Sequence, residues 1–123
     1  MQASIRLANA TLDVWSINIT DVTSGSSYQK TVTYAVSQLS AEWIVERPTI
    51  NRVLTQLADF GNVTFTDCQA IVGSDTGGIN SFASSRVVMY SSISPSTPSV
   101  QLTDVSMVST DGKSFIVTYL SIE

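Results

Sequence analysis

Hydrophobic and polar residues alternate along most of the chain in short runs, which is the pattern of β-strands with one buried face. Clusters of Gly, Ser, Asn, Asp and Pro separate the runs, and these residues are typical of turns. The alternating segments are Ser4 to Ala8, Thr11 to Thr20, Tyr28 to Val36, Ala41 to Glu46, Val63 to Phe65, Arg86 to Tyr90, Val100 to Val108 and Lys113 to Ile122. Short strands rich in Thr and Val, separated by such turns, predict an all-β protein with antiparallel sheets.

The segments between these strands carry their own signals. Asp111-Gly112 predicts a hairpin turn, because both residues tolerate positive φ. A turn is also expected at residues 74–78, and the stretch Ser91 to Ser99, which contains two prolines, predicts a surface loop. Helical signals are few. Asn51 to Asp59 has apolar residues at helical spacing and predicts one or two helical turns, although its Thr and Asn are poor helix formers.

The length of 123 residues is that of one domain, and 43% hydrophobic residues are enough to form a core. We therefore predict a single domain over residues 1–123, folded as an antiparallel β-sandwich. No apolar run approaches the roughly 20 residues of a membrane-spanning helix. Met1 to Ser4 lacks the basic and then apolar pattern of a signal peptide, so we expect a chain that stays inside the cell or has lost a leader.

Charge and the missing residue types exclude several kinds of chemistry. The net charge is −4 with a pI near 4.5, so the chain has no basic surface for nucleic acid or for an anionic membrane. Histidine is absent, which excludes Ser-His-Asp and Cys-His catalysis and zinc sites with His ligands. The single cysteine, Cys68, forms no intrachain disulfide, and we expect it to be a small buried apolar residue.

Two strings of residues carry more specific information. Residues 41–46 read Ala-Glu-Trp-Ile-Val-Glu, and residues 57–66 read Leu-Ala-Asp-Phe-Gly-Asn-Val-Thr-Phe-Thr. In this order and at this separation, the pair closely resembles the signature of the glutamic peptidases, the eqolisins. Weaker similarity at Ser4 to Tyr34 and at Phe115 to Tyr119 extends the resemblance over most of the chain. The matched region corresponds to the C-terminal half or so of a family domain.

This resemblance implies a lectin-like (concanavalin-like) sandwich of two large antiparallel sheets, with an active site on the concave face. It also implies a secreted, extracellular endopeptidase that hydrolyses polypeptide substrates at acidic pH. The family uses a glutamate and a glutamine, without a metal, a cofactor or a covalent intermediate. We therefore expect no cofactor and no metal ion.

Glu42 is the candidate catalytic residue, because it matches the family's glutamate in the Ala-Glu-Trp string. The resemblance implies that it acts as a general base, taking a proton from the attacking water and giving one to the leaving amine. In an extended segment Glu42, Ile44 and Glu46 share one face, and Trp43 and Val45 point the other way. We expect Ile44 and Glu46 to bind substrate or shape the site. From alternation alone, both glutamates would be ordinary solvated carboxylates.

The family's second catalytic residue has no counterpart in this chain. That glutamine stabilises the oxyanion and lies in a segment well upstream of the Ala-Glu-Trp string, which nothing in residues 1–40 matches. Gln38 is the glutamine closest in sequence to Glu42. An oxyanion donor is commonly worth a factor of about 100 to 1000 in rate, so the chain carries half of the family's active site.

Three functional hypotheses follow from these observations. The first is a glutamic endopeptidase, or the portion of one that carries Glu42, with the missing half supplied by a second chain, by a second copy or by sequence beyond these residues. The second is a non-catalytic β-sandwich module that binds peptide or glycan. The third is an assembly protein, a homodimer or a complex with a complementing chain, formed through open sheet edges.

Two other acidic residues are assigned structural roles. Asp75-Thr76-Gly77 occurs once, whereas aspartic peptidases need two carboxylates that share a proton. Asp59, in the second string, is expected to accept a hydrogen bond within its own turn.

Overall fold

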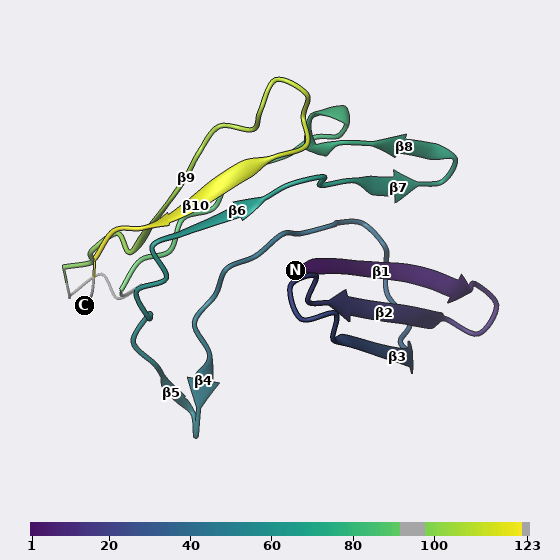
Figure 1. The fold of residues 1–123 in the computed structure, drawn as a ribbon, viewed down its shortest axis with the longest axis horizontal. Coiled ribbons are helices and arrows are strands. Elements are labelled where there is room, and N and C mark those ends of the chain that lie inside the picture. The colour runs from purple at the N-terminus through teal and green to yellow at the C-terminus, as the bar shows by residue number, and fades with distance from the viewer. Residues whose placement is uncertain (92–97, 122–123) are drawn as a thin grey trace. The chain divides into compact units, whose positions relative to one another are not determined.

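The computed structural model describes residues 1–91 and 98–121. In this part of the chain the regular secondary structure consists of antiparallel β-strands and one short 3₁₀ helix (Figure 1). This confirms the predicted all-β class. The chain divides into two compact units, the N-terminal unit Met1–Ser40 and the C-terminal unit Ala41–Glu123, which are described separately. The single domain expected over residues 1–123 stays a prediction.

The N-terminal unit is a three-stranded antiparallel meander. Its strands β1 (Gln2–Asn9), β2 (Val14–Thr20) and β3 (Ser27–Thr33) lie in the order β1-β2-β3 (Figure 1). The expected alternation sets the register: Leu7 pairs with Trp15, and Trp15 with Val32, so apolar residues share one face. β2 begins later than predicted, because the Asn9 side-chain oxygen accepts the N–H groups of Thr11 and Leu12 in a turn.

The apolar face of this meander is exposed within its own unit. Ile5, for example, is 69% exposed. A shallow hollow of about 430 Å³ lies on this face, lined by Ile5, Trp15, Ile17, Val32, Tyr34 and Val36. The indole N–H of Trp15 donates to the Tyr34 carbonyl at 2.9 Å and fixes one side of the hollow. The N-terminal unit therefore presents an apolar surface that its own residues do not cover.

The C-terminal unit is built on a second three-stranded antiparallel sheet. Strand β10 (Phe115–Tyr119) lies in the centre, between β6 (Asn62–Phe65) and β9 (Thr103–Val105). Two hairpins, β4 (Thr49–Ile50) with β5 (Val53–Leu54) and β7 (Ala70–Val72) with β8 (Asp75–Gly77), extend from it (Figure 1). The 3₁₀ helix η1 (Ile79–Ser81) follows β8.

The core of the C-terminal unit lies around β9 and β10. Leu102 is fully buried, and the other buried side chains among the residues that the structure describes are Leu57, Cys68, Thr103, Val105 and Val117. The one polar member, Thr103, accepts the Met89 N–H through its hydroxyl oxygen at 2.9 Å. The expected burial of Cys68 is confirmed, and this burial raises the pKa of its thiol, with a smaller effect from the charge of Asp67.

The predicted helical turns at Asn51 to Asp59 are wrong. Residues 49–54 form the β4–β5 hairpin instead, with Asn51 and Arg52 at φ of 51° and 66°. A two-residue turn with two positive φ values suits the right-handed twist of a hairpin, and Asn tolerates that conformation well. The turn predicted at residues 74–78 is also misplaced. The chain turns at Gly73 and Ser74, and Asp75–Gly77 is strand β8.

Two predicted strands do not form as expected. Tyr90 makes only an isolated bridge with Gln101, so Arg86 to Tyr90 is not a regular strand. Ala41 to Glu46 belongs to no β-ladder among the described residues. Alternation favours an extended backbone, but a ladder also needs a neighbouring segment with a matching register. Most of the predicted loop Ser91 to Ser99 lies outside the described residues.

The predicted Asp111-Gly112 turn is confirmed. The Ser109 N–H donates to the Ser114 carbonyl at 2.8 Å, and Gly112 has a φ of 76°. The Asp111 carboxylate accepts the Ser109 hydroxyl and the Lys113 N–H. These hydrogen bonds, the one from Ser109 first, lower the pKa of Asp111. The Asp111 carboxylate is thus stabilised mainly by a hydroxyl and a backbone N–H. The chain has few basic side chains that could take this role.

Asp111→Asn is expected to destabilise the protein at neutral pH and to have less effect in acid. Because the folded state lowers this pKa, the contribution is complete above the unfolded pKa of about 3.9. It is lost as the pH falls through the lower folded value. Urea midpoints of wild type and variant, measured against pH, should converge in acid, and Ser109→Ala should show the same direction. Midpoints that stay parallel at all pH values would contradict this assignment.

Candidate active site

The segment with Glu42 begins the C-terminal unit and presents its residues alternately. Glu42, Ile44 and Glu46 are exposed, and Ile44 is 56% exposed, whereas Trp43 and Val45 are half-buried. This is the exposure pattern of an extended backbone with one face on the protein. The Glu42 and Glu46 carboxylates are therefore on the solvent-exposed face of the segment. The catalytic and site-shaping roles of Glu42, Ile44 and Glu46 stay predictions.

Arg47 fixes the end of this segment. Its guanidinium donates to the carbonyls of Ser91 at 2.9 Å, Thr55 at 3.3 Å and Tyr90 at 3.4 Å. The adjacent Pro48 carbonyl accepts both the N–H and the hydroxyl of Thr55, at 3.1 and 2.8 Å. The planar group of arginine can serve several acceptors at once. Arg47 therefore ties the segment with Glu42 to the β4–β5 hairpin and to the bridge at Tyr90.

Sequence reasoning missed this role of Arg47. Its acceptors are backbone carbonyls, and two of them lie more than 40 residues away in the chain. The one local signal is an arginine that follows a mostly apolar run and precedes a proline. That signal does not tell which carbonyls the side chain will reach.

The second string, residues 57–66, builds the entry to β6. Asp59 accepts the Gly61 N–H at 2.9 Å, which confirms the hydrogen bond expected within its turn. The Gly61 carbonyl accepts the Tyr119 N–H at 2.8 Å, and the rings of Phe60 and Tyr119 meet edge to face at 5.9 Å. Burial raises the pKa of the Tyr119 hydroxyl, and the charge of Asp59 adds to this effect. The string thus joins β6 to β10.

Two glutamines, Gln101 and Gln38, are candidate partners of Glu42. Gln101 lies in the C-terminal unit, but its amide donates to the Thr103 carbonyl at 2.8 Å and is used within its own segment. Gln38, at a φ of 54°, belongs to the N-terminal unit.

Residues 1–91 and 98–121 contain no group of three or more His, Cys, Asp or Glu side chains placed to hold a metal ion. They also include no helix that is long and apolar enough to cross a membrane.

Comparison with known proteins gives the family of this chain. The model of the peptidase A4 family matches residues 1–119, so the chain belongs to that family of glutamic peptidases. Its structure is similar to the crystal structure of aspergilloglutamic peptidase from Aspergillus niger, with 29% sequence identity and a TM-score of 0.71. The match covers 97% of this chain and 65% of that one. No curated protein matches the chain.

These findings confirm two expectations from the sequence. The resemblance of the two strings to the glutamic peptidases is a true family relationship, and the fold matches the β-sandwich of a glutamic peptidase. The chain spans less than two thirds of the length of the fungal enzyme.

Proposed function

We propose that the chain is an acid-active glutamic endopeptidase in which Glu42 is the general base. The observation that carries this proposal is the position of Glu42. It lies in the Ala-Glu-Trp string of a chain that belongs to the peptidase A4 family, and its side chain is exposed on an anchored segment. Trp43 next to it is half-buried, and Arg47 ties the end of the segment to the carbonyls of Thr55 and Ser91. A general base needs such support, because a small displacement of its carboxylate strongly lowers the reaction rate.

The reaction needs only one proton carrier. The Glu42 carboxylate takes a proton from water as the water oxygen attacks the peptide carbonyl carbon. The protonated Glu42 then gives that proton to the amide nitrogen, the C–N bond breaks, and the carboxylate is restored. Ile44, on the same exposed face, offers an apolar contact for a substrate side chain, and Glu46 adds negative charge beside it.

The oxyanion formed in this reaction needs a hydrogen-bond donor. The family's glutamine segment has no match in residues 1–40, so in this proposal a second copy of the chain supplies the donor. Such a copy would bring new side chains beside Glu42.

Cleavage of a denatured protein by the purified chain tests this function. We expect new amino termini to appear faster at acidic than at neutral pH, with no effect of a metal chelator. A folded sample that releases no new termini at either pH would contradict the proposal. Circular dichroism of the same sample at both pH values is the control, since it shows whether the chain is folded during the assay.

A non-catalytic binding module is the second candidate function. The observation that favours it is the uncovered apolar hollow of about 430 Å³ in the N-terminal unit. Exposed apolar surfaces of this kind often bind peptides or proteins. Saturable binding of the denatured substrate without cleavage would support this candidate instead of the peptidase.

A further inference from the structure

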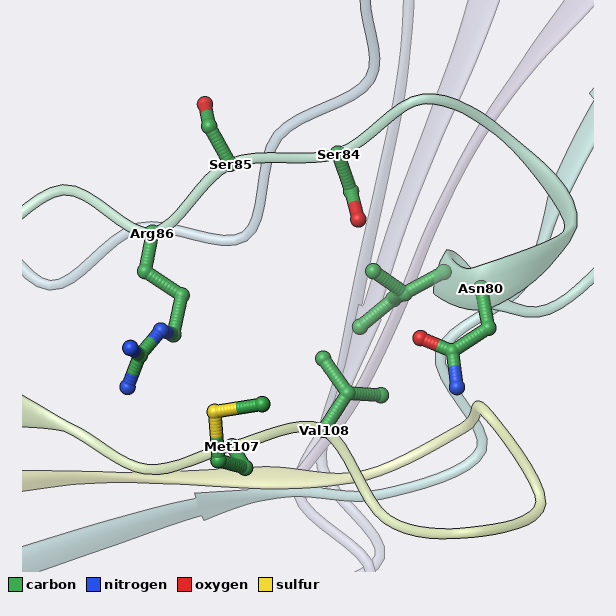
Figure 2. Close-up of a pocket in the computed structure, with 7 residues that line it drawn as sticks. Asn80, Ser84, Ser85, Arg86, Met107 and Val108 are labelled. Carbon is green, nitrogen blue, oxygen red and sulfur yellow. The ribbon is translucent and has the colours of Figure 1, made fainter.

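The C-terminal unit contains a small pocket, and the residues that line it are distant from Glu42 in the sequence. It has a volume of about 280 Å³ and lies between η1, residues 84–86 and the segment after β9. Its apolar lining residues are Ile79, Met107 and Val108, which we call the apolar patch. The polar side chains of Asn80, Ser84 and Arg86 lie around Met107 and Val108 (Figure 2). The volume is near the lower limit of small-molecule sites, about 300–1,000 Å³. A single amino-acid residue is a ligand of suitable size.

Arg86 gives the pocket a positive charge. One guanidinium nitrogen, Nη1, donates to the Val105 carbonyl at 2.8 Å, which holds the side chain in place. Within residues 1–91 and 98–121, no acidic side chain forms an ion pair with Arg86, and its remaining N–H groups make no other hydrogen bond. An arginine with free donors in a fixed fork is well suited to bind a carboxylate through two parallel hydrogen bonds.

The other polar groups complement a peptide end. The Asn80 Nδ2 donates to the Ser109 carbonyl at a long 3.5 Å, which leaves its Oδ1 to accept a hydrogen bond from a ligand. The Ser84 hydroxyl is directed toward the pocket in Figure 2 and has no hydrogen-bond partner among the described residues. The pocket thus combines a cation, an acceptor, a hydroxyl and an apolar patch.

Two of the three segments around the pocket, η1 and the segment after β9, are held by backbone hydrogen bonds. The Ile79 N–H donates to the Gly112 carbonyl at 2.7 Å, and an added Cβ at Gly78 would lie 2.5 Å from that carbonyl oxygen. η1 therefore packs closely on the turn at Gly112. On the opposite side, the Ser106 N–H donates to the Ile116 carbonyl at 2.9 Å and holds the segment with Met107 against β10. A pocket fixed in this way loses little freedom when a ligand binds.

We infer that this pocket binds the C-terminal residue of a peptide that ends in an apolar side chain. The terminal carboxylate pairs with Arg86, and the amide N–H of the same residue donates to Asn80 Oδ1. The apolar side chain lies on Ile79, Met107 and Val108. This inference does not depend on the proposed peptidase activity, because it concerns binding at residues that take no part in that reaction.

Titration of the full chain with three related ligands, followed by NMR at neutral pH, tests the inference. N-acetyl-L-leucine is expected to bind with a Kd on the order of 1 mM, a weak affinity that suits a small, partly open pocket. It should shift the amide signals of Ile79, Asn80 and Arg86. N-acetyl-L-leucinamide, which lacks the carboxylate, is expected to bind at least about tenfold more weakly, since a charged hydrogen-bonded pair is lost. 4-Methylpentanoate keeps the carboxylate and the apolar group but lacks the amide, and it too should bind more weakly.

Variants assign the carboxylate contact to its residue. Arg86→Met is expected to weaken the binding of N-acetyl-L-leucine by at least about tenfold, and Arg86→Lys, which keeps the charge but loses the fork, by less. Arg52→Met, at the exposed β4–β5 turn, is the matched control and should leave binding unchanged. Equal binding of acid and amide, unchanged binding to both Arg86 variants, or no saturable shifts would overturn the inference. Equal binding of 4-methylpentanoate would overturn the role of Asn80 and the peptide as ligand.

Discussion

Replacing Glu42 by glutamine is expected to lower the rate of peptide cleavage by about 100- to 10,000-fold, the usual contribution of a general base. The glutamine side chain has nearly the same size and shape, but its amide cannot take a proton from water. Because residue 42 is exposed, the substitution should leave the fold intact. The value of kcat/KM for a peptide substrate at acidic pH measures the effect.

Glu46→Gln is the matched control for this prediction. Glu46 lies on the same exposed face and undergoes the same change of charge, so it reports the effect of a lost negative charge without the loss of the base. Only a small change is expected. If Glu46→Gln lowers kcat/KM as much as Glu42→Gln does, the assignment of the base to Glu42 alone is wrong.

Leu102→Ala is expected to have the largest effect on stability, about 2–5 kcal/mol of the free energy of unfolding. The Leu102 side chain has no exposed surface and lies at the centre of the core around β9 and β10. Truncation removes buried apolar surface and leaves a cavity. Its backbone groups, which bond to Met89 and Leu120, are unchanged. Since small domains have a total stability of about 5–15 kcal/mol, the variant should be much easier to unfold.

Urea unfolding of wild type and variant measures this loss. Leu39→Ala makes the same chemical change at a side chain that is 88% exposed, and it should stay within about 0.5 kcal/mol of wild type. A loss below about 1 kcal/mol for Leu102→Ala would show that the side chain is not tightly packed in solution.

The sequence predicted the parts of the fold that local patterns determine. In β1 to β3, alternation and turn residues act on adjacent segments, so strands and pairing follow from the chain itself. The same holds for β10 and the turn at Gly112. The β4–β5 hairpin was missed because its apolar residues, such as Ile50 and Val53, are exposed. Its sequence therefore does not show the alternation that marks a strand with one buried face. The opposite error occurs at Ala41 to Glu46. Its alternation is clear and predicted a strand, but no described strand pairs with it.

Only the residues of the candidate site that belong to a sequence motif could be predicted. Glu42 follows from the Ala-Glu-Trp string, and the expected turn at Asp59 follows from the local chemistry of Asp before Gly. Arg47 and Arg86 were not predictable, because both donate to carbonyls that the fold brings near them from distant parts of the chain. Such contacts depend on tertiary structure, and no characteristic spacing of residues in the sequence marks them.

The most direct test of the central claim is to identify by mass spectrometry the peptides that the folded wild-type chain releases from a denatured protein at acidic pH in ¹⁸O-labelled water. The proposed reaction predicts new carboxyl termini that each carry ¹⁸O from the attacking water, and their loss in Glu42→Gln. Labelled termini that persist in this variant, or no new termini from the folded wild-type chain, would contradict catalysis by Glu42.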